Sequence, residues 1–302
     1  GRYLFGKITC RDYTFRKGIE LLALCEQAKL PIGEIMLLRE LDESERSRDE
    51  VLGEMAKNLE TMRASVEEGL SGGLRSVSGL TGGDAARLRA HAGAGESLSG
   101  GRMLEAVAAS MAVVEVNASM GRIVAAPTAG ASGILPGTLL ACAKRRGWSD
   151  EALLLALFNA GAVGLVIAKN ASISGAEGGC QAETGAAAAM AASALTELSG
   201  GTPAQCLHAA AMALKNVMGL VCDPVAGLVE CPCIKRNAIG AANALLCADM
   251  ALAGIESLIP FDEVVLAMKS VGRLMSPDLR ETARGGVAAT PTARAIAKRL
   301  EE

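Results

Sequence analysis

Residues 151–260 contain only 12 charged side chains in 110 positions, and this scarcity is the strongest constraint on the fold. A stretch of this length with so few charges has to lie mostly in the interior of the protein. The chain is half hydrophobic but has only seven aromatic residues, so Ala, Leu, Val, Ile and Met supply its apolar volume. Ala, Leu and Met favour helices, whereas strands favour β-branched and aromatic residues. We therefore predict a helical body whose Ala and Gly residues allow close packing.

The first part of the chain has a different character. Residues 41–70 contain 13 charged side chains, as expected of solvated amphipathic helices. We divide the chain into an amphipathic helical N-terminal region, 1–100, and a helical body, 101–302, which together form one continuous domain. No segment alternates convincingly with period two, so the predicted fold class is all-α. Helices are expected at 16–29, 33–41, 46–69, 102–119, 133–145, 151–169, 184–198, 203–218, 236–253, 263–275 and 291–300.

Charge and cysteine content narrow the function classes. A net charge of −3 and a pI of about 5.7 give no electrostatic reason to expect nucleic acid or a membrane as partner. The apolar stretch 152–168 contains Asn159 and is short for a membrane span, so we predict a buried core helix there. Nine cysteines in a long chain without a signal-peptide pattern argue against a disulfide framework. We expect a cytoplasmic protein with reduced thiols, some of which are metal ligands.

Three Gly/Pro-rich segments lie between the predicted helices of the body, at residues 125–133, 172–180 and 222–233. Loops held by a rigid scaffold often carry function, so these segments are the candidate site. The cysteines divide in the same way. Cys10 is uninformative, and a role as small buried hydrophobes is expected for those in helical patterns, namely Cys25, Cys142, Cys206 and Cys247.

The remaining cysteines, Cys180, Cys222, Cys231 and Cys233, lie in the loop segments. Cys180 follows a glycine pair and begins a helix, a position that lowers the pKa of a thiol. From the pattern alone, a metal or cluster site and ordinary structural thiols both stay open. The spacings of 42 and 11 residues match no zinc-finger rule, and the chain has only two histidines. A thiolate-held iron–sulfur centre is therefore favoured over zinc.

The segment 127–133, Pro-Thr-Ala-Gly-Ala-Ser-Gly, leads into a predicted helix. A glycine-rich turn at a helix N-terminus is a natural anion site. No Gly-Lys-Ser/Thr follows and no dinucleotide fingerprint is present, so a small carboxylate is the expected ligand. An ordinary capped turn is the alternative.

Together these segments resemble the α chain of bacterial iron–sulfur L-serine dehydratases, and the resemblance covers nearly the whole chain. The matching motifs are SGLTGGD (78–84), NASMGR (117–122), APTAGASG (126–133), EGGCQAE (177–183), CDPVAGLVE (222–230) and PCIKRN (232–237). The resemblance implies an all-helical catalytic domain with a [4Fe–4S] cluster, and no pyridoxal phosphate. The family positions of the three cluster ligands are Cys180, Cys222 and Cys233.

The implied reaction is loss of water from L-serine, which gives pyruvate and ammonia. The open iron of such a cluster acts as a Lewis acid on the hydroxyl group, and a base removes the α-proton. Thr128, Gly130 and Ser132 are expected to hold the substrate carboxylate through hydroxyl and backbone N–H groups. Asp223 either orients the loop around Cys222 or belongs to a plain turn.

Two features depart from the family pattern. Position 231, usually apolar, is Cys231 here, and it is a rival or accessory ligand to Cys233. Some single-chain relatives end in a cysteine that caps the open iron, and this sequence ends Ala-Lys-Arg-Leu-Glu-Glu. Water or substrate is then expected at the fourth position.

No residue of the chain stands out as the base. We expect structural roles for His91 and His208, loop-ordering roles for Glu177 and Glu183, and a solvated helix start for Lys235 and Arg236. In the family the proposed base is a His of the β portion, so the resemblance implies a separate β chain as partner. Two alternatives stay open, namely a cluster-dependent cysteine desulfidase and a non-catalytic iron–sulfur or zinc structural subunit.

Overall fold

The computed structural model describes residues 12–95 and 97–302, and this part of the chain folds into thirteen α-helices and no strands. The all-α prediction is confirmed. The helices are α1 (Gly18–Ala28), α2 (Ile32–Ser44), α3 (Arg48–Ser71), α4 (Asp84–Gly93), α5 (Gly101–Ala118), α6 (Ile134–Arg146), α7 (Asp150–Asn170), α8 (Gly175–Gly178), α9 (Cys180–Leu198), α10 (Pro203–Asn216), α11 (Cys233–Leu252), α12 (Phe261–Leu274) and α13 (Pro291–Glu301). Four short 3₁₀ turns are η1 (Ala129–Ala131), η2 (Val225–Gly227), η3 (Pro277–Leu279) and η4 (Gly286–Ala289).

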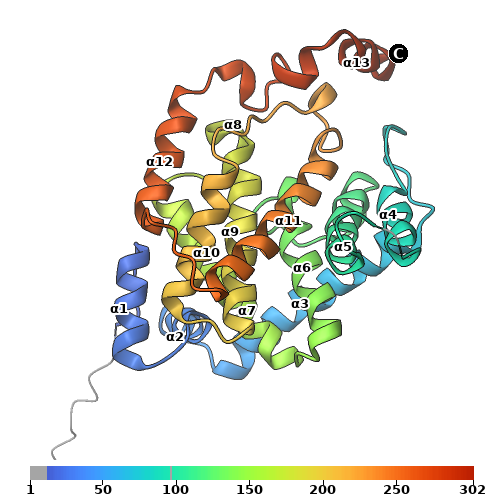
Figure 1. Ribbon diagram of the computed structural model, residues 1–302. Helices are drawn as coiled ribbons and strands as arrows, with labels where there is room; N and C mark the ends of the chain where they lie inside the picture. Colours follow the sequence, from blue (N-terminus) through green and yellow to red (C-terminus); the bar gives the residue numbers. More distant parts are fainter. Residues whose placement is uncertain (1–11, 96) are drawn as a thin grey trace, which may run out of the picture.

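Helix α9 is the centre of the body, and α6, α7, α10 and α11 pack around it (Figure 1). Every residue of α9 is buried except Glu183, Glu197 and Leu198. Its run of alanines has no side-chain entropy to lose and permits short distances between helix axes. The scarcity of charge in this part of the sequence thus reflects a helix with neighbours on all sides.

Glycines set the spacing of a second layer, in which α5 packs against α6 and α3. A methyl group at Gly137 of α6 would overlap the backbone and hydroxyl of Ser110 in α5. One at Gly69 of α3 would overlap the backbone of Ala112. These contacts bring backbone against backbone, so no rotamer change of a neighbour can relieve the overlap.

Helix α7 corresponds to the apolar stretch predicted as a core helix. It is long and apolar enough to cross a membrane by composition, and more than half of that stretch is buried in the fold. Its neighbours are α9 on one side and α2 on the other. α3 also packs on α5, so helices from both sides of residue 100 are in contact. The predicted domain division at residue 100 stays a prediction.

Helix α4 is absent from the predicted set of helices, and glycines flank it at 82, 83, 93 and 95. The carboxylate of Glu115 in α5 accepts the N–H groups of Asp84 and Ala85 at 2.7 and 3.3 Å, which caps the start of α4 from a distant part of the sequence. His91, placed in a polar loop by the sequence, lies in the last turn of α4.

The packing of α5 against α6 gives a stability prediction with opposite signs at two glycines. We expect Gly137→Ala to lower the free energy of unfolding by about 1–3 kcal/mol, because the methyl group overpacks the contact with Ser110. Gly53 in α3 is exposed, with nothing within 4 Å of its added methyl. Gly53→Ala should therefore raise that free energy by about 0.5–1 kcal/mol. Urea unfolding of the two variants checks both, and a neutral Gly137→Ala variant would contradict the close approach.

Candidate functional site

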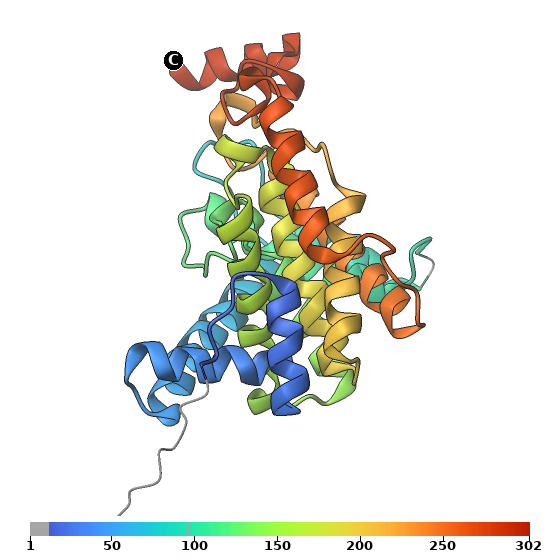
Figure 2. The same cartoon turned by 90° about the vertical axis from the view of Figure 1, so that its left-hand side faces the viewer.

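The three Gly/Pro-rich segments meet at one end of the helical body. The first contains η1, the second contains α8 and leads into Cys180 at the start of α9, and the third runs from Cys222 through η2 to Cys233 at the start of α11. Figures 1 and 2 show this end beneath the C-terminal segment that carries η3, η4 and α13, far from α1 and α2 at the opposite end. The prediction that these loops form one site is consistent with this arrangement.

The thiols of Cys180, Cys222 and Cys233 lie close enough to influence one another. Cys180 and Cys222 are buried, and Cys233 is half-buried. Burial raises the pKa of Cys222, and the negative charges of Cys180 and Glu183 raise it further. Burial likewise raises the pKa of Cys233 to about 12, with Cys180 as the next cause. Three cysteines that are 42 and 11 residues apart in sequence are therefore electrostatic neighbours.

The expected lowering of the Cys180 pKa was wrong. The thiol lies at the first position of α9, 3.1 Å from the hydroxyl of Thr184, and the guanidinium of Arg236 is nearby. Both neighbours lower the pKa, but burial has the larger effect and raises it. Burial therefore favours the neutral form of these thiols, and binding a metal centre would have to release their protons.

The donor set fits a cluster better than a single ion. Within residues 12–95 and 97–302, no three His, Cys, Asp or Glu side chains have the geometry to hold one metal ion. The ligands of a cluster bind different iron atoms, so their sulfur atoms stand further apart than the ligands of one ion. Three thiols with no histidine among them match the preference of iron–sulfur centres. The assignment of Cys180, Cys222 and Cys233 as ligands stays a prediction.

A segment that the sequence did not single out holds the loop of Cys222 in place. The backbone N–H of Cys222 donates to Leu279 O at 2.9 Å, and the N–H of Glu281 donates to Cys222 O at 2.7 Å. The result is an isolated parallel bridge between Cys222 and Arg280. The residues 279–281 carry no motif, so this contact could not be predicted from the sequence.

Asp223 orients the loop, as one of the two sequence interpretations expected. Its carboxylate is buried, lies 2.8 Å from the guanidinium of Arg236 and accepts the N–H of Val287 at 2.6 Å. Arg236 also donates to Val221 O at 2.7 Å. The expected solvated position was wrong for Arg236, because this ion pair takes its side chain to 13% exposure. The expected solvated position is confirmed for Lys235, whose side chain is 63% exposed and pairs with Asp84.

Asn237 connects the first segment to α11. Its side-chain amide donates to Gly130 O at 2.7 Å and to Cys233 O at 2.9 Å, and its carbonyl oxygen accepts the N–H of Gly133 at 3.1 Å. One fully buried side chain therefore fixes both ends of the turn 130–133 relative to a predicted cluster ligand.

The three residues predicted to hold a carboxylate have different surroundings. The Ser132 hydroxyl donates to Ala129 O at 2.7 Å, so it is used inside the turn. The Thr128 hydroxyl is buried and makes no well-formed hydrogen bond with any described residue, although it lies near enough to the Glu183 carboxylate to lower its pKa. Gly130 faces Glu183 and Val229. Of the two hydroxyls, Thr128 is the one left for a ligand.

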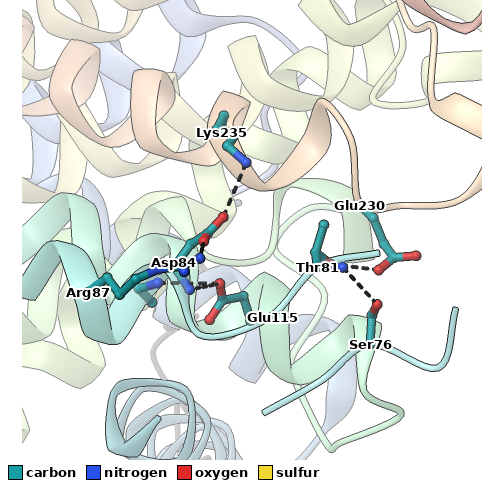
Figure 3. Close-up of polar contacts among 8 residues, drawn as sticks. Ser76, Thr81, Asp84, Arg87, Glu115, Glu230 and Lys235 are labelled. Atoms are coloured by element: carbon teal, nitrogen blue, oxygen red, sulfur yellow. Dashed lines mark hydrogen bonds and ion pairs between the residues drawn. The ribbon is translucent and has the colours of Figure 1, made fainter. Parts of the chain in front are cut away.

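A polar cluster ties the segment 78–84 to the third loop (Figure 3). The buried carboxylate of Glu230 accepts the hydroxyl of Ser78 at 2.5 Å and that of Thr81 at 2.6 Å. Close by, Lys235 donates to Asp84 at 3.2 Å. The segment 78–84 thus supports the loop between Cys222 and Cys233.

Among the described residues, Cys231 and the two histidines make no hydrogen bond to the thiols of Cys180, Cys222 or Cys233. Cys231 is half-buried, and its backbone oxygen accepts the N–H of Val225 at 2.9 Å. His208 lies in α10, where its Nδ1 accepts the N–H of Ser257 at 3.2 Å. This contact suits the structural role expected for His208.

Comparison with known proteins identifies close relatives. The family model described as "Serine dehydratase alpha chain" matches residues 27–288. A "Probable L-serine dehydratase, alpha chain" of Bacillus subtilis is 51% identical over 286 residues, 95% of each chain. An "L-serine dehydratase, alpha chain" of Peptoniphilus asaccharolyticus is 44% identical over 277 residues, 92% of this chain and 95% of that one. An "L-serine dehydratase" of Streptomyces coelicolor is 41% identical over 288 residues, 93% of this chain but only 62% of that protein.

The contacts of Asn237 give a prediction for the site. Asn237→Ala leaves Gly130 O and the Gly133 N–H without their partner, at a cost of about 1–3 kcal/mol for each buried group. We expect a lower free energy of unfolding, measured with urea, while Asn58→Ala on the exposed face of α3 changes it by less than about 0.5 kcal/mol. Equal effects of the two variants would show that Asn237 does not fix the turn.

Proposed function

The chain belongs to the serine dehydratase alpha chain family, and we propose that it is the α chain of a two-chain iron–sulfur L-serine dehydratase. The reaction is a β-elimination: the α-proton and the hydroxyl group of L-serine leave as water. The resulting aminoacrylate takes up water and releases ammonia to give pyruvate. The observation that carries the proposal is the meeting of three thiols, one from the second segment and two from the third, beside the turn 128–132 at one end of α9.

The proposed ligands of a [4Fe–4S] cluster are Cys180, Cys222 and Cys233. When bound, such a cluster supplies a Lewis acid for the substrate hydroxyl, since three protein ligands leave one of four irons open. The Arg236 guanidinium beside Cys180 offsets part of the negative charge that three thiolates bring into a buried site. The family and the donor set support this cluster rather than pyridoxal phosphate.

The chain's own residues bind and orient the substrate. The Thr128 hydroxyl and the backbone N–H groups of the turn 128–132 hold the substrate carboxylate in our proposal. That hydroxyl is buried beside the Glu183 carboxylate and makes no well-formed hydrogen bond with a described residue, which supports the assignment. Asn237 holds this turn at a fixed position relative to Cys233, so the substrate carboxylate and the metal centre are pre-positioned. Burial keeps bulk water away from the thiols of Cys180 and Cys222.

The missing base points to a second chain. His91 is in α4, and His208 is used by Ser257 in α10. The Bacillus and Peptoniphilus relatives named as alpha chains match this chain along 95% of their length, whereas only 62% of the Streptomyces L-serine dehydratase is matched. We therefore propose that a separate β chain contributes the base for the α-proton.

The reducing cytoplasm is the compartment we propose, because all eight described cysteines are free.

A groove beside the site is the face that we assign to the β chain. Its volume is about 560 Å³, and Val229, which faces Gly130, and Glu230 of the third loop line one side. Apolar side chains with high exposure form its rim, including Val77 at 76% and Met120 at 82%. A chain bound there would reach the turn and would cover apolar surface that is otherwise in water.

The ligand assignment predicts which cysteines are needed for iron. Cys180→Ser, Cys222→Ser and Cys233→Ser should each abolish the visible absorption of the reconstituted chain and pyruvate formation by the two-chain enzyme. The buried thiols of Cys25 and Cys247 lie elsewhere, so Cys25→Ser and Cys247→Ser should leave both unchanged. Full iron content in Cys222→Ser would rule the assignment out. Release of sulfide from L-cysteine, with no pyruvate from L-serine, would identify L-cysteine as the substrate instead.

The turn assignment predicts a loss of catalytic efficiency in Thr128→Val, which removes the hydroxyl at nearly constant volume. A hydrogen bond to a charged group contributes about 1.5–3 kcal/mol, so kcat/KM for L-serine should fall about ten- to a hundredfold. Iron content should not change. An unaltered kcat/KM would count against a carboxylate at this turn.

The partner assignment predicts that the iron-loaded chain alone turns over L-serine about 10²–10⁴-fold more slowly than the two-chain enzyme, because it lacks the base. Met120→Glu places a charge on the groove and should prevent the β chain from restoring activity. Ile19→Glu, on the exposed face of α1 at the opposite end of the molecule, serves as the matched control. Efficient turnover by the isolated chain would contradict the need for a partner.

A further inference from the structure

We propose that Glu183 binds the α-ammonium group of the substrate and so selects amino acids over hydroxy acids that lack this group. The assignment rests on the proposed function, since it concerns the same site. The sequence pattern predicts only a loop-ordering role for Glu183. Its neighbours Gly130 and Cys222 are more than 35 residues away in sequence, so the pattern does not relate them to Glu183.

Glu183 lies between the turn and a predicted cluster ligand. It is in the first turn of α9, three residues after Cys180. A methyl group on Gly130 would lie 3.4 Å from its Oε2 and 3.6 Å from its Oε1. One on Gly175 would lie 3.0 Å from the same Oε2 and 2.9 Å from the sulfur of Cys222. The carboxylate is thus next to the turn on one side and next to Cys222 on the other.

The carboxylate has no cationic partner in the described part of the chain. None of the ten ion pairs between residues 12–95 and 97–302 includes Glu183. Burial raises its pKa, and the charge of Glu281 raises it further, while the Thr128 hydroxyl has the opposite effect. A buried carboxylate without a cation is costly unless a ligand supplies one.

The chemistry of an amino acid matches this arrangement. Its ammonium and carboxylate groups are attached to the same carbon atom, so a ligand whose carboxylate lies on the turn has its ammonium group within reach of a neighbouring anion. Glu183 is that anion, because its carboxylate oxygens lie 3.4 and 3.6 Å from the position that a methyl group on Gly130 would take. The third substituent of L-serine, the hydroxymethyl group, is then left for the metal centre. Two charged contacts fix the orientation of a small substrate that has little apolar surface to bind.

Two other roles for Glu183 make different predictions. As a ligand of the open iron it would be needed for iron content. As the base it would be needed for kcat and less for KM. A residue that binds the ammonium group affects KM for amino acids and leaves iron content and the affinity for a ligand without the amino group unchanged.

The test compares Glu183→Gln with Glu177→Gln in the iron-loaded two-chain enzyme. Glu177 belongs to the same motif but is exposed, and its carboxylate accepts the hydroxyl of Ser172 at 2.7 Å. The measurements are iron content, kcat and KM for L-serine, and the inhibition constant of 3-hydroxypropionate, which is serine without its amino group. For Glu183→Gln we expect full iron content, a KM raised about ten- to a hundredfold and an unchanged inhibition constant. Glu177→Gln should match the wild type.

Loss of iron, a fall in kcat with unchanged KM, or parallel changes for serine and 3-hydroxypropionate would each overturn the assignment. So would wild-type values throughout. A wild-type enzyme that forms no pyruvate from L-serine would overturn the proposed function and this assignment with it. An active wild type with an unaffected Glu183→Gln variant would overturn this assignment alone.

Discussion

Close packing around α9 is the constraint on which the rest of the structure depends. The helix is buried along nearly its whole length, and its alanines allow four neighbouring helices to approach it. Because α9 begins at Cys180 and α11 begins at Cys233, the packing of these two helices also sets the distance between two predicted ligands. The packing of the helices thus sets the positions of these two cysteines independently of the contacts within the loops.

Buried polar side chains then hold the loops on this scaffold. Asn237 joins the first segment to α11, and Asp223 joins the third segment to Arg236 and to the C-terminal turn η4. Glu230 accepts two hydroxyl groups from the segment 78–84. Buried polar groups of this kind are costly when unpaired and rigid when paired. The site is therefore built from loop segments that have little conformational freedom, as catalysis by positioning requires.

The sequence predicted the helices well because most of them have a buried face with a clear 3.6-residue period. It failed at α4, which glycines flank and whose start is capped by Glu115 from another element. Three features of the site were also out of reach. The pairing of Cys222 with residues 279–281, the burial of Arg236 and the unpaired position of Glu183 all depend on contacts between distant segments. The pKa of Cys180 was misjudged because local helix position was considered without desolvation.

Our central proposal is that three thiols, Cys180 of the second segment and Cys222 and Cys233 of the third, hold a single four-iron cluster whose remaining iron meets the substrate. The most direct measurement is a Mössbauer spectrum of the chain loaded anaerobically with isotopically enriched iron, taken before and after addition of L-serine. The account predicts one iron subsite that differs from the other three and changes when L-serine binds. A spectrum with four equivalent irons, or with fewer than four irons per chain, or one unaffected by L-serine in the two-chain enzyme, would contradict it.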